Sequence, residues 1–268
     1  MARNTTVARY DLVDAAYDAP GSPKIARSVV ICSTPRSGST LLAESLLSCG
    51  TFGTPMEYFD WEGSAAILRG RWLTQDFDAY VSALHAHRTA SNGVFSLKIH
   101  WNQLVGAAQR ASYKPNQAPL KNLLGRIAPN PVLVHITRDD RVAQAISLYR
   151  AATTNSWSSL SDHADDIEPP YSFAAIDGYV KALSAWEKNW EILLTTAHLP
   201  YATIRYEDLV GSEGPVVDEI ARFAGIPQLG PASIAPRLRR QANEWSKETA
   251  ARYRDDAGAD SANRFTDG

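Results

Sequence analysis

Four short segments along the chain have the composition of β-strands. They are Arg27–Ser33, Val94–Ile99, Pro131–Thr137 and Tyr201–Tyr206. The first contains an unbroken apolar run from residue 29 to residue 32, and the third contains the sequence Val-Leu-Val-His-Ile-Thr. Continuous apolar runs are typical of strands that are buried on both faces, as in parallel sheets. The pattern therefore predicts strands of a mainly parallel sheet.

Segments with apolar residues three and four positions apart lie between these strands, which is helical spacing. The helix after the first strand is expected to stop at Gly50, a residue that favours helix C-termini. The predicted helices are Ser39–Cys49, Asp76–His87, Trp101–Arg110, Leu120–Ile127, Asp139–Ala152, a long helix through Tyr179, Leu183, Trp186 and Trp190, Val216–Ala224, and a polar helix to about Arg254. Strands that alternate with helices predict an α/β fold, a single domain with a mainly parallel central sheet flanked by helices.

The length of 268 residues corresponds to fewer than two domains at about 150 residues each. Residues 1–26 contain many Ala and Asp residues together with Pro20, Gly21 and Pro23, and they are expected to form an N-terminal leader. The folded domain is expected over residues 27–256. Residues 257–268 are expected to form a flexible tail.

Composition and charge exclude several classes of protein. Hydrophobic residues make up 44% and charged residues 21% of the chain, which excludes a disordered protein. A net charge of -2 argues against bulk attraction to nucleic acid or to an anionic membrane. Neither a membrane-spanning run nor a signal peptide is visible. The two cysteines have no zinc-site spacing, so a reduced, cytoplasmic setting and a protein without a metal are expected.

The segment from residue 33 to residue 40, Ser-Thr-Pro-Arg-Ser-Gly-Ser-Thr, joins the first predicted strand to a helix. Gly38 allows the backbone to approach an anion closely, and the amides and dipole of the helix start favour its charge. The side chains that add donors to this turn are Arg36, Ser37, Ser39 and Thr40. The segment therefore predicts a phosphate-binding loop, with a polar turn and a solvated arginine as the alternative.

Two well-known phosphate loops do not fit this segment. A nucleoside triphosphate loop requires Lys after its last glycine, whereas Gly38 is followed by Ser39. A cysteine phosphatase loop beginning at Cys32 would require Arg six positions later, where Gly38 stands. A metal-dependent kinase of related fold is therefore disfavoured but stays open as an alternative.

The sequence STPRSGSTLLAESL closely resembles the phosphosulfate loop of sulfotransferases, especially the bacterial family typified by trehalose 2-sulfotransferase. These enzymes move a sulfuryl group from 3′-phosphoadenosine 5′-phosphosulfate (PAPS) to a hydroxyl. Many sulfotransferases have Lys at the position of Arg36, and the arginine matches the trehalose-type branch. The resemblance implies that the cosubstrate is bound by Pro35, Arg36, Ser37, Gly38, Ser39 and Thr40.

Further matches follow in order along the chain. Arg138 at the end of the third strand, with Ser147 nine residues later, resembles the family's 3′-phosphate site. Tyr206, in the segment Tyr-Glu-Asp-Leu, matches a tyrosine that lies near the adenine in cytosolic sulfotransferases. The C-terminal dipeptide Arg240-Gln241, followed by Arg252-Tyr253-Arg254, is a weaker match. Together the matches span residues 29–254.

The segment Gly53–Phe59 resembles the part of the trehalose-type enzymes that contains the catalytic carboxylate, here Glu57. Neighbouring aromatic residues are expected to exclude water and to raise the pKa of this carboxyl group. Lys98 is a candidate second cation. His100 is the rival base, because Lys98 and His100 reproduce the Lys-x-His spacing of cytosolic sulfotransferases and alternate strand residues share a face.

The resemblance implies a metal-independent, in-line transfer of sulfuryl to a hydroxyl of a carbohydrate or other small molecule, with trehalose as one candidate. Thr54 stands where the trehalose-type pattern has an acidic residue, so the acceptor stays open. The alternatives are a sulfotransferase with a histidine base acting on a non-sugar metabolite, a kinase with a P-loop-like fold, and a nucleotide-binding module without catalysis. A homodimer is also implied by the resemblance.

Overall fold

The computed structural model describes residues 11–19, 21, 24–113, 120–157, 167–227 and 243–266. The chain divides into two compact units. One contains the segments Asp11–Asp139 and Trp186–Pro236, and the other contains Asp140–Ala185 and the C-terminal segment. Among the described residues, none of the helices combines the length with the apolar composition that a membrane span requires.

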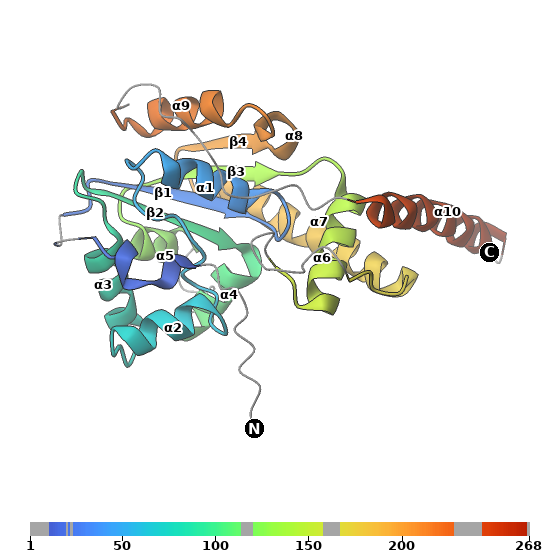
Figure 1. Ribbon diagram of the computed structural model, residues 1–268, viewed down its shortest axis with the longest axis horizontal. Helices are drawn as coiled ribbons and strands as arrows, with labels where there is room; N and C mark the ends of the chain where they lie inside the picture. The colour runs from blue at the N-terminus through green and yellow to red at the C-terminus, as the bar shows by residue number, and fades with distance from the viewer. Residues whose placement is uncertain are drawn as a thin grey trace. The chain divides into compact units, whose positions relative to one another are not determined.

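The first unit is built on a four-stranded sheet in the order β2-β1-β3-β4, in which every neighbouring pair is parallel (Figure 1). The strands are β1 (Arg27–Ser33), β2 (Val94–His100), β3 (Pro131–Thr137) and β4 (Tyr201–Arg205). The predicted α/β class and all four predicted strands are confirmed. The last strand is one residue shorter than expected, because Tyr206 begins a helix.

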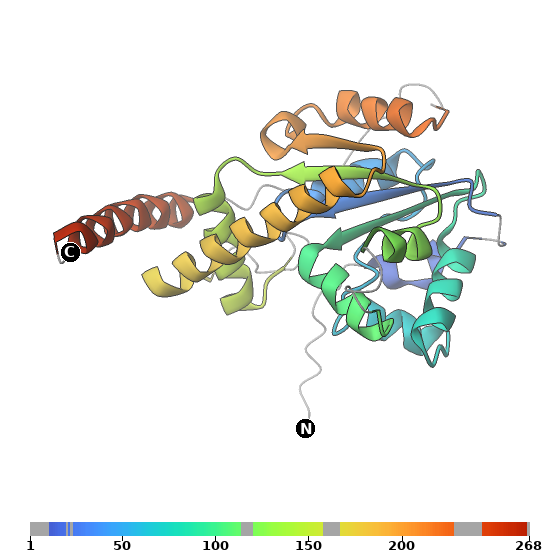
Figure 2. The ribbon, with the colours of Figure 1, turned by 180° about the vertical axis from the view of Figure 1, so that it is seen from behind.

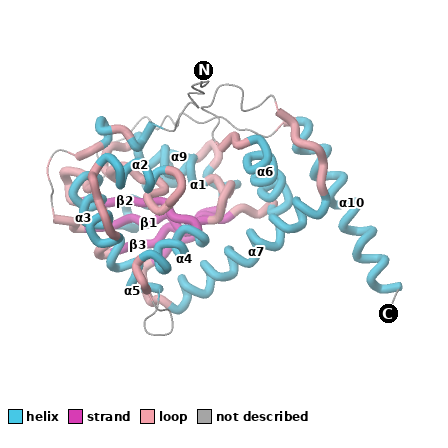
Figure 3. The backbone as a smooth tube through the Cα atoms, turned by 90° about the horizontal axis from the view of Figure 1, so that it is seen from below, coloured by secondary structure: helices cyan, strands magenta, loops and turns pink. Residues whose placement is uncertain are grey.

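Helices cover both faces of this sheet, as the view from below in Figure 3 shows. The helices of this unit are α1 (Ser39–Ser48), α2 (Ser64–Arg71), α3 (Phe77–Arg88), α4 (Trp101–Arg110), α5 (Leu120–Ile127), α8 (Tyr206–Leu209), α9 (Glu213–Ala224) and the second half of α7 (Phe173–Thr196). Helices α1 and α9 pack together over one face, where Leu42, Leu46 and Ile220 meet the apolar side chains of β1 and β3. On the opposite face, α5 and the second half of α7 lie across the strands (Figure 2).

The register of the sheet aligns the carboxyl ends of β1, β2 and β3. Ser33, the last residue of β1, lies opposite His100 at the end of β2 and opposite Ile136 near the end of β3. The loop that follows Ser33 therefore leaves the sheet between the ends of β2 and β3. In open α/β sheets this edge is where ligands bind.

Part of the segment before β1 is folded. Residues 11–18 form two short 3-10 turns that are part of the first unit, with Leu12 fully buried. The buried guanidinium of Arg88 on α3 donates to the backbone oxygens of Leu12 at 2.8 Å and Tyr17 at 3.3 Å, and it pairs with Asp18 at 3.2 Å. A buried cation thus binds residues 12–18 to the first unit, and the assignment of residues 1–26 as an N-terminal leader stays a prediction.

The second unit contains α6 (Arg141–Thr154), the first half of α7 and α10 (Glu244–Thr266). Helix α10 packs against α6, and Tyr253 stacks on Phe173 and donates a hydrogen bond to Asp177 at 3.0 Å. Helix α10 continues to Thr266, and the assignment of residues 257–268 as a flexible tail stays a prediction. The sequence predicts this helix only to about Arg254, because a polar helix shows little apolar periodicity.

Candidate active site

The loop between β1 and α1 has an unusual backbone. Arg36 and Gly38 both adopt positive φ angles, 64° and 89° respectively. A Cβ atom added at Gly38 would lie 2.3 Å from the ring of Tyr206, so only glycine allows this ring to pack against the loop. Helix α1 starts at the next residue, and its first amides are therefore adjacent to the turn, the arrangement that binds anions.

The loop contains a buried donor that suits a bound oxyanion. The hydroxyl of Ser37 is buried and has no hydrogen-bond partner among the described residues. Leaving such a group unpaired is costly, and an acceptor oxygen from a phosphate or sulfate group would satisfy it. The loop residues therefore fit the anionic group that the sequence predicts.

Arg138 follows β3 and lies beside the same loop. Its Nη1 atom donates to the backbone oxygen of Arg36 at 3.2 Å, and its guanidinium lies 4.8 Å from the centre of the Tyr206 ring. The structure thus brings together three predicted binding residues from the ends of β1, β3 and β4. Ser147 lies on α6 in the other unit, and its pairing with Arg138 stays a prediction. Arg240 and Gln241 lie outside the described residues.

On the β2 side of the loop, Glu57 is the centre of a polar cluster. Its Oε1 atom lies 2.7 Å from Nζ of Lys98 and 3.4 Å from Nε2 of His100, and its Oε2 atom accepts from Gln103 at 2.6 Å. The ammonium of Lys98 also donates to the hydroxyl of Thr40, at 2.8 Å. The predicted base, the predicted cation and the anion loop are thus joined by one chain of contacts.

The imidazole of His100 is held on both sides. Its Nδ1 atom lies 2.9 Å from the hydroxyl of Ser33, and its Nε2 atom faces Glu57. The backbone amide of His100 donates to the side chain of Gln103 at 3.0 Å, which completes a capping box at the start of α4. Sequence reasoning missed the roles of Ser33 and Gln103, because histidine is not among the N-cap residues that mark a capping box in a sequence.

The electrostatics of Glu57 differ from expectation. Burial by itself would raise the pKa of the Glu57 carboxyl, but the charges and hydrogen bonds of Lys98 and His100 hold that pKa well below its usual range. The expected rise in pKa is therefore wrong. The aromatic residues Tyr58 and Phe59 are buried in the interior, so the carboxylate meets a cation rather than an apolar wall.

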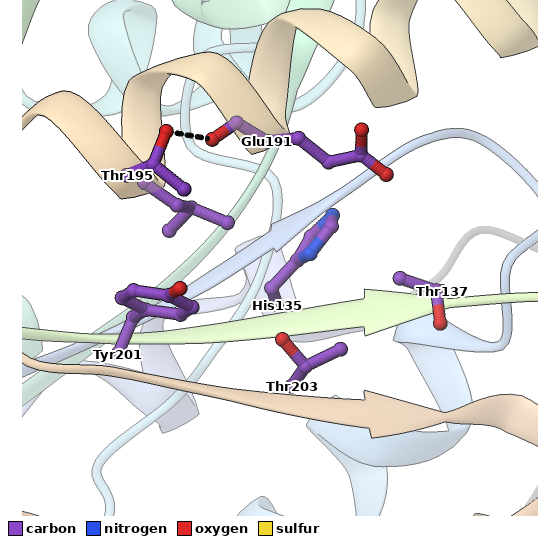
Figure 4. Close-up of a pocket in the computed structure, with 7 residues that line it drawn as sticks. His135, Thr137, Glu191, Thr195, Tyr201 and Thr203 are labelled. Atoms are coloured by element: carbon purple, nitrogen blue, oxygen red, sulfur yellow. Dashed lines mark hydrogen bonds between the residues drawn. The ribbon is translucent and has the colours of Figure 1, made fainter.

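On the other side of the sheet, a cleft of about 160 Å³ lies between β3, β4 and the second half of α7 (Figure 4). It is lined by His135, Thr137, Glu191, Leu194, Thr195, Tyr201 and Thr203. None of the predicted catalytic residues lines this cleft. Across the described ranges, no three His, Cys, Asp or Glu side chains are grouped so as to hold a metal ion.

A loop at a helix start after the first strand of a parallel sheet, with cations from the neighbouring strands, suits a bound anion. The model of the Stf0 sulphotransferase family matches residues 28–256, and the chain belongs to this family. It is therefore an enzyme of the sulfotransferase class, and the resemblance found in its motifs is confirmed.

Two curated relatives are both named trehalose 2-sulfotransferase. The one from Mycobacterium tuberculosis is 31% identical over 264 residues, and the one from Mycolicibacterium smegmatis is 30% identical over 258 residues. Each alignment covers 86% of this chain and 96% of the relative. Among solved structures, the sulfotransferase domain of the Synechococcus PCC 7002 olefin synthase is 17% identical, with a TM-score of 0.44 over 87% of this chain and 90% of that domain.

Proposed function

We propose that this protein transfers a sulfuryl group from PAPS to a hydroxyl of a carbohydrate, with trehalose as the first candidate. The single observation that supports this most is the position of Lys98, which contacts both Thr40 of the anion loop and the carboxylate of Glu57. The ammonium group of Lys98 would then lie between the sulfuryl donor bound on the loop and the base that activates the acceptor. The names of the two curated relatives support the choice of trehalose.

The donor side of the reaction rests on the loop and its neighbours. The helix-start amides, Arg36 and the unpaired hydroxyl of Ser37 bind the phosphosulfate oxygens. When the bond from sulfur to the phosphate oxygen breaks, negative charge grows on that oxygen, and Arg36 and Lys98 stabilise it. Arg138 with Ser147 holds the 3′-phosphate, and Tyr206 lies beside the adenine.

On the acceptor side, Glu57 takes the proton of the attacking hydroxyl as the new bond from oxygen to sulfur forms. Its low pKa makes it a weak base as long as Lys98 neutralises it. An anion bound on the loop competes for Lys98, and this raises the basicity of Glu57 when the donor is in place. Gln103 holds the second carboxylate oxygen and so fixes the direction of the first.

His100 supports Glu57 in this proposal and is not the base itself. Its Nδ1 atom is engaged by Ser33, and its Nε2 atom points at the carboxylate, 3.4 Å away. A neutral imidazole in this position orients Glu57, and a protonated one lowers its pKa. In the alternative, His100 takes the proton and the acceptor is a non-sugar metabolite. Because His100 lies only 3.4 Å from Glu57, it could reach the same acceptor hydroxyl, and substitutions at the two residues distinguish the two bases.

The experiment that tests the proposed function supplies labelled PAPS, or ATP with magnesium, to the purified protein with trehalose, glucose and sucrose as acceptors. We expect transfer from PAPS alone, with EDTA leaving the rate unchanged because Arg36 and Lys98 supply the positive charge. A strict need for magnesium and ATP would indicate a kinase. Binding of the product nucleotide PAP without transfer to any acceptor, including cell-extract metabolites, would indicate a binding module.

A further inference from the structure

A second carboxylate and imidazole lie on the β3 side of the loop, and the mechanism above does not use them. Glu187 on α7 and His135 on β3 are 7% and 2% exposed, and Oε1 of Glu187 lies 3.1 Å from Nε2 of His135. The other carboxylate oxygen, Oε2, accepts from the hydroxyl of Thr34 at 3.4 Å. Thr34 is the first residue after β1, so this pair reaches the start of the anion loop.

Helix α7 contacts the same point through a second residue. The indole Nε1 of Trp190 donates to the backbone oxygen of Ser33 at 2.8 Å, and its fully buried ring packs edge-to-face on Trp101 at 5.2 Å. Residues 187 and 190 are three positions apart and share a helix face. The helix therefore contacts two consecutive residues at the exit of β1, one through its backbone and one through its hydroxyl.

The side chain of Thr34 is fully buried, and its hydroxyl faces Glu187. A carboxylate next to an anion-binding loop opposes anion binding by its charge. If Glu187 acts mainly by its charge, its removal should strengthen anion binding. If Glu187 acts mainly by fixing the loop, its removal should weaken anion binding.

We propose that Glu187 is a positioning residue of the donor site, which fixes the first turn of the anion loop through Thr34, while its other carboxylate oxygen lies against His135 without a hydrogen bond to it. This inference rests on the proposed function, because it assumes that the loop binds PAPS. The loop has positive φ angles at Arg36 and Gly38, a conformation that its neighbours must hold in place. Loss of the contact to Thr34 lets the first turn relax and weakens the binding of the donor.

The test is calorimetric titration of PAP into the full chain, with thermal melting of each variant. We expect Thr34→Val, which removes only the donor, to weaken PAP about 3- to 15-fold, and Thr34→Ser to stay within about 2-fold of the wild type. Glu187→Leu should cause a similar loss, whereas Glu187→Gln keeps an acceptor for Thr34 and should restore most of the affinity. Glu191→Gln, one turn further along α7, is the matched control and should leave PAP binding unchanged.

The double variant Thr34→Val/Glu187→Leu should lose no more affinity than the weaker-binding single variant, because both substitutions break the same contact between Thr34 and Glu187. A double loss equal to the product of the single losses would overturn the inference, as would wild-type affinity in Thr34→Val or tighter binding in Glu187→Leu. If Glu187→Leu does not fold, the comparison of Thr34→Val with Thr34→Ser decides. A wild-type chain that does not bind PAP would instead contradict the proposed function.

Discussion

Two pairs of a carboxylate and an imidazole lie on either side of the strand that leads into the anion loop, and their surroundings differ. On the β2 side, the Glu57 side chain is 29% exposed and contacts His100, Lys98 and Gln103. On the β3 side, the Glu187 side chain is 9% exposed and faces His135 and Thr34. Each pair reaches one residue at the exit of β1, through the hydroxyl of Ser33 or of Thr34.

The comparison shows that a pair of this kind does not define a catalytic site by its chemistry alone. A general base must be reached by the acceptor, and Glu57 has an exposed edge whereas Glu187 is enclosed. A base must also respond to the donor, and only Glu57 contacts a lysine that is shared with the loop. Under the proposed function, the exposure of Glu57 and its contact with Lys98 favour a role in the reaction for the first pair, and the enclosure of Glu187 favours a positioning role for the second.

The largest effect outside the carboxylates is expected at Arg36. Replacing it with Ala removes a charged donor from the departing phosphate and should lower the rate of transfer about 10²- to 10³-fold. Arg36→Lys keeps the positive charge and should lower the rate of transfer much less. Steady-state kinetics with labelled PAPS measure both, and equal losses in the two variants would show that the planar guanidinium, rather than its charge, is required.

Recognition of the donor nucleotide should depend on Arg138. A charge-assisted hydrogen bond contributes about 1.5–3 kcal/mol, so Arg138→Ala should weaken PAP about 10- to 150-fold. Adenosine 5′-phosphosulfate lacks the 3′-phosphate and should be far less sensitive. The measurement is a calorimetric titration of both nucleotides, and equal losses would show that Arg138 acts by stacking on Tyr206 rather than on the 3′-phosphate.

A smaller loss is expected at His100, about 10-fold in rate for His100→Asn, because the imidazole orients Glu57 without taking the proton. The Glu57→Gln substitution should lower the rate at least ten times more than His100→Asn does. The two variants are compared by single-turnover transfer from bound PAPS. An inactive His100→Asn variant beside an active Glu57→Gln variant would reverse the ranking and assign the base to His100.

The smallest expected effect is on stability at acid pH. The pKa of Glu57 is depressed in the folded state, so its stabilising contribution is complete above the unfolded value of about 4.3 and is lost as pH falls through the lower folded value. The difference in thermal melting between the wild type and Glu57→Gln should therefore shrink below about pH 4. The rate profile should show no acid limb from Glu57 in the free enzyme between about pH 5 and 8, and a limb near pH 6 that Glu57→Gln abolishes would contradict the depressed pKa.

The sequence alone could predict those parts of the fold and site that depend on local pattern. The strand around Val30 is apolar at consecutive positions, so its burial could be predicted directly. Lys98 and His100 are alternate residues of one strand, so their position on a shared face could be predicted as well. Helix α2 was not predicted, since only Ala65 and Leu68 are buried on it. The full length of α10 was missed for a related reason, since a polar helix has little periodic signal.

Contacts between distant parts of the chain could not be predicted in this way. Trp190 lies 157 positions from Ser33, and Glu187 lies 153 positions from Thr34, so no local spacing joins them. The pKa of Glu57 was predicted in the wrong direction for the same reason. Aromatic neighbours in sequence suggested an apolar pocket, whereas the cation that decides the pKa, Lys98, comes from another strand.

The most direct test of the account is the turnover of Glu57→Gln and Glu187→Gln, measured side by side with labelled PAPS and trehalose at saturating concentrations. Each variant replaces a carboxylate with an amide of the same shape. The account predicts that Glu57→Gln lowers kcat about 10²- to 10⁴-fold, while Glu187→Gln keeps kcat within a few-fold of the wild type. Equal losses in the two variants, or an active Glu57→Gln enzyme, would contradict the assignment of reaction to one pair and positioning to the other.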